Sequence, residues 1–316
     1  MEKAIAVEPL NHSPARAARP GLGDDEMAMH IALTFDDNFW APAYATMRSV
    51  CLFTHRRDDL VFHLCHRTLT DAHRADIDRI REEFPVELRW YDLDRSDLFR
   101  DIAGRMPENK RLSNIVYARL MIDRLVSPDV ERILYLDCDM LVRDDISYLF
   151  ELELEGYSIA AVRDSIGAFI TGRRDLRSNR DLFDPADYYF NAGMVLIDVA
   201  KWSEADILGR MEEAYASGIM QRIYYDQDLL NLIFKGKWLK LPWRWNVIDA
   251  RHAHDGVDPA ILHYTGENKP WGIFSHTFQS VAFARFYRHV MTNDLFYRFA
   301  RHRWKRWWQK KLGLAR

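Results

Sequence analysis

Short apolar runs alternate with segments of helical periodicity along the chain. Runs that are continuously apolar or alternate with a period of two predict β-strands at 29–35, 60–65, 86–91, 133–136, 158–162, 238–245 and 261–264. Residues 188–198 predict a turn or bulge followed directly by a further apolar strand. Apolar positions at helical spacing predict helices at 42–50, between Thr70 and Pro85, and at 113–125, 202–217 and 226–234. Strand–helix alternation over the first half predicts an α/β layer structure around a mainly parallel sheet.

Polar side chains follow two of these strands directly. They are Asp36, Asp37 and Asn38 after 29–35, and Asp137 and Asp139 after 133–136. Ligands of open α/β sheets bind at the carboxyl ends of the strands. The sequence therefore predicts a ligand site at this edge of the sheet.

Two of these carboxylates are spaced one residue apart. In an extended chain, residues i and i+2 project from the same face, so Asp137 and Asp139 point together and Cys138 points away. Two like charges at the end of a buried strand repel each other, and a divalent cation makes the arrangement favourable. The alternative is that the two aspartates only cap a turn, and the motif by itself leaves both interpretations open.

The composition is that of an ordinary globular protein. Of 316 residues, 48% are apolar and 29% are charged, and no apolar run is long enough to span a bilayer. Residues 1–28 are rich in proline and glycine without periodicity and show no secretory signal pattern, so we expect a flexible leader. Three cysteines without metal-type spacing predict free thiols in a reducing compartment.

The charge is unevenly distributed. The formal net charge is −3, but residues 282–316 hold ten Lys/Arg and one acid, a balance of +9, which leaves −12 on the rest. An excess of acid over 29–281 argues against nucleic-acid binding by that part. Aromatic and basic residues interleave from 296 to 311, a pattern that suits a helix on an anionic membrane, although nucleic-acid binding uses similar chemistry. The predicted organisation is a leader (1–28), a catalytic domain (29–281) and a basic, aromatic C-terminal tail (282–316).

Several motifs occur together in a characteristic order. They are Leu33-Thr34-Phe35-Asp36-Asp37-Asn38, Tyr117-Ala118-Arg119, Tyr135-Leu136-Asp137-Cys138-Asp139, Tyr189-Phe190-Asn191-Ala192-Gly193, Asp226-Gln227-Asp228 and His263-Tyr264-Thr265-Gly266-Glu267-Asn268-Lys269-Pro270-Trp271. With them the chain resembles the bacterial glycosyltransferases of family 8, retaining galactosyl- and glucosyltransferases that build lipopolysaccharide or lipooligosaccharide. The resemblance spans about residues 30 to 275. It implies a single Rossmann-like nucleotide-sugar-binding domain of the GT-A type with a mixed central sheet.

The resemblance also implies a donor site. The metal ligands would be Asp137, Asp139 and His263, and an imidazole among the ligands favours Mn²⁺ over Mg²⁺. The remaining donor-binding residues would be Thr34, Asp36, Asn38, Arg119, Cys138, Gly266 and Lys269, with Asp36 near the base, Asn38 near the ribose and Lys269 at the phosphates. Plainer alternatives are a structural histidine, an Asx turn and a surface ion pair of Arg119.

On the sugar side, the resemblance places four residues. They are Asp164, Asn191, Asp226 and Gln227. Retention by double displacement needs a nucleophile, usually a carboxylate, and an amide is a poor one, so front-face attack is favoured. Arginines 173, 174, 177 and 180 lie where the family has a loop over donor and acceptor, which suggests an anionic acceptor or merely a solvated loop.

The sequence thus predicts a metal-dependent enzyme that moves galactose or glucose from UDP-galactose or UDP-glucose to a saccharide or lipid-linked glycan. A membrane-borne acceptor favours the membrane interpretation of 282–316, hence a cytoplasmic protein at the inner face of the cytoplasmic membrane. A non-catalytic nucleotide-sugar or carbohydrate-binding relative is the alternative. A metal-dependent phosphohydrolase is a third possibility, but no carboxylate cluster for a second metal is evident in the sequence.

Overall fold

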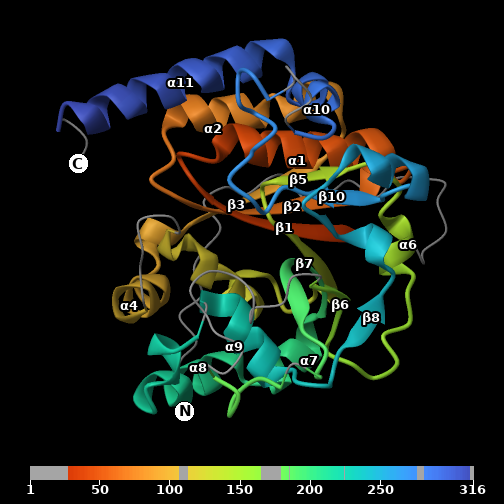
Figure 1. The fold of residues 1–316 in the computed structure, drawn as a ribbon, viewed down its shortest axis with the longest axis vertical. Helices are drawn as coiled ribbons and strands as arrows, with labels where there is room; N and C mark the ends of the chain where they lie inside the picture. The colour runs from red at the N-terminus through yellow and green to blue at the C-terminus, as the bar shows by residue number, and fades with distance from the viewer. Residues whose placement is uncertain are drawn as a thin grey trace.

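A mixed, seven-stranded sheet forms the centre of the molecule (Figure 1). The computed structural model describes residues 28–106, 113–164, 179–184, 186–223, 225–275 and 281–313. The strand order is β3-β2-β1-β4-β7-β6-β8, formed by β1 (Met29–Asp36), β2 (Leu60–Arg67), β3 (Glu87–Asp92), β4 (Arg132–Leu136), β6 (Ile159–Arg163), β7 (Phe190–Asp198) and β8 (Leu239–Leu241). The first four strands in this order are parallel, whereas β7 runs antiparallel to both β4 and β6.

A smaller sheet lies beside this one. It consists of β5 (Met140–Val142), β9 (Val247–Ile248) and β10 (Ile261–His263), with β10 in the middle. Strand β10 pairs with β5 in antiparallel register, so that His263 faces Met140. The small sheet thereby brings a segment from late in the chain next to the turn that follows β4.

Helices cover both faces of the main sheet (Figure 1). On one face lie α1 (Trp40–Phe53), α2 (Asp71–Asp78), α10 (Ala284–Met291) and α11 (Asn293–Lys311), and on the other lie α4 (Asp97–Arg105), α7 (Val199–Glu204), α8 (Ile207–Ala216) and α9 (Tyr225–Ile233). Shorter helices are α3 (Ile80–Glu83), α5 (Ile122–Leu125), α6 (Ser147–Phe150) and the 3-10 helices η1 (Arg57–Asp59), η2 (Leu93–Arg95), η3 (Asn114–Met121), η4 (Ile219–Gln221), η5 (Trp243–Trp245) and η6 (His252–Val257).

Side chains that alternate along the strands form one hydrophobic core on each face of the main sheet. In β4, Leu134 and Leu136 are buried in the cluster that includes α1, whereas Ile133 and Tyr135 are buried in the cluster on the opposite face. This arrangement confirms the expected α/β fold with a mixed sheet. The cysteines Cys51, Cys65 and Cys138 are free and buried, also as expected.

Three predicted elements differ from the structure. The expected helix 202–217 is divided into α7 and α8, because Asp206 adopts a left-handed conformation (φ 48°) and caps α8 by accepting a hydrogen bond from Gly209 N. The expected strand 238–245 ends at Leu241, because the following Pro242 has no N–H for a ladder. Residues 114–121 form the 3-10 helix η3, a segment packed between β1, α4, α8 and α9, where tertiary contacts override an amphipathic period.

The C-terminal region is helical, as expected, and its first part belongs to the core. Tyr287 of α10 and Phe296 and Phe299 of α11 are at most 2% exposed and join the cluster that contains α1. Beyond them α11 extends past the body of the molecule (Figure 1), with Trp304 and Trp307 at least half exposed. The domain boundary at residue 282 stays a prediction. None of the described helices is long and apolar enough to cross a membrane.

Candidate active site

The strand directions bring the predicted polar residues to one edge of the sheet. Asp36 ends β1, Asp137 follows β4 and Asp164 follows β6, all at the carboxyl ends of strands that point the same way. Because β7 runs in the opposite direction, its beginning lies at this edge, and there it carries Asn191. Residues far apart in sequence therefore meet where α/β sheets bind ligands.

Two carboxylates and an imidazole converge here. The turn between β4 and β5 supplies Asp137 and Asp139, and β10 supplies His263. His263 Nε2 lies 3.2 Å from Asp139 Oδ1 and 3.7 Å from Asp137 Oδ2. One ligand atom from each residue lies within 4.8 Å of the others. The structure thus brings together the three residues expected to hold a metal.

Lys269 also reaches this cluster. Its Nζ lies 2.7 Å from Asp139 Oδ2, and it donates to the carbonyl oxygen of Tyr264. Burial by itself raises the pKa of the Asp139 carboxyl, but His263 and Lys269 outweigh that effect and hold the pKa well below its usual range. Asp139 is therefore ionised at neutral pH, which is the form that binds cations.

Gly193 of β7 leaves the space that the cluster occupies. Its carbonyl oxygen accepts a hydrogen bond from Asp137 N at 2.8 Å. A Cβ at this position would lie 2.7 Å from Asp137 Oδ2, 3.0 Å from Asn191 Oδ1 and closer still to His263 Cε1. Only a glycine permits this approach. The donor set and the side-chain-free space fit a divalent cation of the manganese or zinc class.

Asn246 connects His263, a predicted metal ligand, to Asn191, which is expected on the sugar side. Its Oδ1 lies 3.0 Å from His263 Nδ1, and its Nδ2 donates to Asn191 Oδ1 at 3.0 Å. Because the second bond orients the amide, Oδ1 accepts from His263 Nδ1–H, and Nε2 is the ring nitrogen that faces the carboxylates. Asn246 is 1% exposed and was not singled out from the sequence. The one available signal was a polar residue directly after the aromatic run 243–245.

Arg119 is buried between two carboxylates. Its Nη2 lies 2.9 Å from Asp137 Oδ1, its Nε lies 2.6 Å from Asp226 Oδ2, and its Nη1 donates to Ala192 O at 2.5 Å. The guanidinium also stacks over the Tyr135 ring, 4.3 Å from its centroid. At 7% exposure, Arg119 is not a surface ion pair.

The carboxyl of Asp226 is less acidic than usual. Burial raises its pKa to about 6, with Arg119 opposing this rise and Asp137 adding to it. Arg119 thus connects Asp137, one of the three clustered ligand candidates, to Asp226 of α9.

Gln227 is held by a hydrogen-bond network. Its Oε1 accepts from Asn191 Nδ2 at 3.2 Å and from Ala192 N at 3.0 Å, and its Nε2 donates to Asp164 Oδ2 and to Tyr189 Oη, each at 3.2 Å. Tyr189 Oη in turn donates to Asp228 at 2.5 Å. Three of the four residues expected on the sugar side, Asp164, Asn191 and Gln227, are therefore joined by hydrogen bonds, and the fourth, Asp226, precedes Gln227 in α9. Tyr189 and Asp228 are supporting residues that belong to the quoted motifs but had no assigned role.

In the turn after β1, the residues expected to bind the donor form hydrogen bonds with one another. The Asp36 carboxylate accepts hydrogen bonds from Asn38 N at 2.8 Å and from Asn38 Nδ2 at 3.1 Å, an Asx turn. Thr34 Oγ1 lies 2.7 Å from Tyr135 Oη, which donates to Asp137. Direct contact of Asp36, Asn38 and Thr34 with a donor stays a prediction.

Two further donor assignments also stay predictions. The thiol of Cys138, in the turn after β4, faces the carbonyl of Thr34, and burial raises the pKa of this thiol well above the usual value. Gly266 is exposed, with no atom near the position of a Cβ. Of the arginines proposed for the acceptor, 173, 174 and 177 lie outside the described residues.

The fold and the site together define a glycosyltransferase of the GT-A type: a Rossmann-like mixed sheet with paired carboxylates after β4 and a histidine from β10. Residues 30–273 match the model of glycosyl transferase family 8. The chain belongs to this family, and it is a glycosyltransferase enzyme.

Individual relatives agree with this assignment. Glycosyltransferase GlyF of Streptococcus pneumoniae is 30% identical over 258 residues, covering 79% of this chain but only 58% of GlyF. Lipopolysaccharide 1,2-glucosyltransferase of Escherichia coli K12 is 26% identical over 280 residues, covering 84% of this chain and 78% of that protein. The structure of galactosyltransferase LgtC with donor and acceptor sugar analogues is similar with a TM-score of 0.68 and 28% identity, covering 83% of this chain and 95% of LgtC.

Proposed function

We propose that this enzyme transfers a hexose, galactose or glucose, from a UDP-sugar to a saccharide of a bacterial surface glycan such as lipopolysaccharide, with retention at the anomeric carbon. The similarity to a lipopolysaccharide glucosyltransferase and to a galactosyltransferase supports the class of donor and acceptor. The observation that carries the proposal is the convergence of Asp137, Asp139 and His263 beside Lys269.

Charge stabilisation at the leaving group is the chemistry that this cluster suits. A divalent ion, Mn²⁺ in preference to Mg²⁺, would be held by Asp137, Asp139 and His263 and would neutralise a nucleoside diphosphate. Lys269 places an ammonium within 2.7 Å of Asp139, where it can stabilise further negative charge. With the leaving group stabilised in this way, no general acid is needed. Asp36 and Asn38 would bind the uridine part of the donor from the turn after β1.

Retention is assigned to attack on the face from which the diphosphate departs. Gln227 is the family's residue near the anomeric carbon, and its Oε1 already accepts two hydrogen bonds. An amide oxygen with both acceptor positions engaged is a poor nucleophile. We therefore assign Asp164, Asn191, Asp226 and Gln227 to positioning the sugar and stabilising positive charge at the anomeric carbon.

The test is calorimetric titration of UDP-galactose and UDP-glucose into the full chain, with Mn²⁺ and with a chelator. We expect binding that requires Mn²⁺, that Asp139→Ala abolishes, and that is tighter for one of the two sugars. A matched control is Asp129→Ala, an exposed aspartate in the turn before β4. Binding that persists equally in chelator, or in the Asp139→Ala variant, would contradict the metal assignment. No binding of either sugar to folded protein would contradict the donor assignment.

We further propose that the exposed part of α11 attaches the enzyme to the inner face of the cytoplasmic membrane. Trp304, Trp307 and Trp308 are 65%, 50% and 43% exposed, and basic residues surround them in the sequence. This combination suits the interface of anionic lipid. Co-sedimentation with anionic vesicles, but not with neutral ones, is expected for the wild type and is expected to be lost when the three tryptophans are changed to serine. Equal sedimentation of both proteins would refute the attachment.

A further inference from the structure

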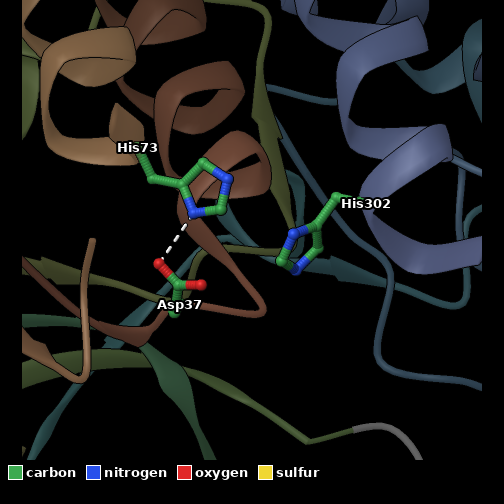
Figure 2. Close-up of side chains that lie close together, drawn as sticks. All are labelled: Asp37, His73 and His302. Atoms are coloured by element: carbon green, nitrogen blue, oxygen red, sulfur yellow. Dashed lines mark hydrogen bonds and ion pairs between the residues drawn. The ribbon is translucent and has the colours of Figure 1, made fainter. Parts of the chain in front are cut away.

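A second cluster of potential metal ligands lies outside the active site. Figure 2 shows Asp37, His73 and His302 facing one another from three separate elements. Asp37 belongs to the turn after β1, His73 to α2 and His302 to α11. One ligand atom from each residue lies within 4.8 Å of the others. Neither the fold nor the proposed reaction requires these three residues to meet.

Hydrogen bonds within the protein account for only part of this cluster. His73 Nδ1 lies 2.7 Å from Asp37 Oδ1, which also accepts from Thr70 N at 2.9 Å. His302 Nε2, by contrast, is buried and has no hydrogen-bond partner among the described residues. A buried nitrogen without a partner costs free energy and calls for an explanation. A bound cation would supply the missing partner.

Aromatic packing holds the two imidazoles in place. Trp40 stacks on His73 with a centroid distance of 4.4 Å and an interplanar angle of 10°. Phe299, one turn before His302 in α11, lies parallel to its ring, 6.3 Å away at 9°. Burial and the nearby His73 lower the pKa of His302, opposed by Asp37. Imidazoles of fixed orientation are common ligands of transition metals.

We propose that Asp37, His73 and His302 bind a divalent transition-metal ion of the zinc class, which cross-links α11 to α2 and to the turn after β1. Two imidazoles and one carboxylate are a donor set that zinc accepts, with water in a further position. The ion would join residues 37, 73 and 302, so it would hold the C-terminal helix against the opposite end of the chain. The cation site is thus structural. It does not depend on the proposed transfer reaction.

The test must separate this cluster from the one at Asp139, so both proteins to be compared carry Asp139→Ala. Zn²⁺ is titrated, in competition with a chromophoric chelator, into full-length protein without a polyhistidine tag. The comparison is Asp139→Ala against Asp139→Ala with His302→Ala. We expect the first protein to bind one equivalent of Zn²⁺ and the second to bind it at least 100-fold more weakly. The control adds His289→Ala to Asp139→Ala instead. His289 is an exposed histidine of α10, and its loss is expected to leave the Zn²⁺ affinity unchanged.

The same affinity with and without His302 would overturn the proposal and would assign the cluster as a plain histidine–aspartate ion pair. Because loss of His302 could disturb α11, circular dichroism is recorded for each protein, and His302→Gln replaces alanine if helix content falls. A second measurement needs only the Asp139→Ala protein: addition of Co²⁺ is expected to produce the visible absorption bands of a cobalt–imidazole site. A colourless protein at saturating Co²⁺ would overturn the assignment as well.

Discussion

Gly193→Ala provides a direct test of how closely the backbone of β7 approaches the proposed metal ligands Asp137 and His263. The new Cβ would lie 2.7 Å from Asp137 Oδ2, whereas ordinary contacts begin at 3.4 Å, so this carboxylate must move by about 0.7 Å. The His263 ring lies closer still and must move farther. Metal coordination tolerates changes of only about 0.2 Å in ligand distance.

The cost to folding and the cost to binding differ in size. Overpacking at one core position destabilises a protein by about 1–3 kcal/mol, which a folded domain of this size can withstand. Displacement of two ligands by more than the coordination tolerance should weaken Mn²⁺-dependent binding of the UDP-sugar by about 100-fold or more. The assay is the calorimetric titration described above, combined with urea unfolding to measure the free energy of unfolding.

The control is Gly104→Ala, an exposed glycine of α4 with no atom within 4 Å of the new Cβ. That substitution should leave donor binding unchanged and should stabilise the helix by about 0.5–1 kcal/mol. If Gly193→Ala bound the UDP-sugar in the presence of Mn²⁺ as tightly as the wild type, the reasoning from the close approach would be refuted.

Three further predictions concern Asn246, His30 and the C-terminal helices. Asn246→Ala removes the acceptor of His263 Nδ1–H, so we expect Mn²⁺ affinity to fall about 10- to 100-fold by calorimetry, and an unchanged affinity would exclude the orienting role. Burial, and after it Arg89, lowers the pKa of His30 from 6.5 to about 4. Between these two pH values the unfolded chain binds a proton that the folded chain does not. The contribution of His30 to the free energy of unfolding is therefore complete above pH 6.5 and is lost as the pH falls towards 4, by at most about 2 kcal/mol at pH 5. Urea midpoints at pH 7 and 5 should show a smaller loss for His30→Gln, and an equal loss would contradict this origin. Deletion of 304–316 should leave the thermal midpoint of unfolding nearly unchanged. Deletion of 282–316 removes Tyr287, Phe296 and Phe299 from the core and should prevent folding. A stably folded protein that lacks 282–316 would contradict this packing.

The sequence was most informative where local rules and the fold agree. Strands were recognisable from their apolar runs. The helix expected after Thr70 begins there, because the Thr70 side chain accepts a hydrogen bond from His73 N and caps α2. Asp137 and Asp139 do meet, as expected, but they lie in the turn between β4 and β5 and not in an extended strand, so the i, i+2 spacing is not the cause. The order of the motifs indicated the family, which the comparisons confirm.

Errors arose where distant residues decide local structure. Residues 114–121 wind into a 3-10 helix because strands and helices surround them, and no local period records that packing. The tail expected at 282–316, by contrast, stays a prediction. Three of its aromatic side chains are buried in the cluster that contains α1, because a helix with one apolar stripe packs on the core regardless of its net charge.

By itself, the sequence determined the class of fold, the family and the chemical types at the site. Only the tertiary structure decided that Asn246 orients His263, that Gly193 must lack a side chain, and that Asp37 meets His73 and His302. Each of these facts is a contact between segments far apart in the chain. Such contacts depend on strand order, register and helix packing, which arise from the whole core and leave no periodic pattern near the residues concerned.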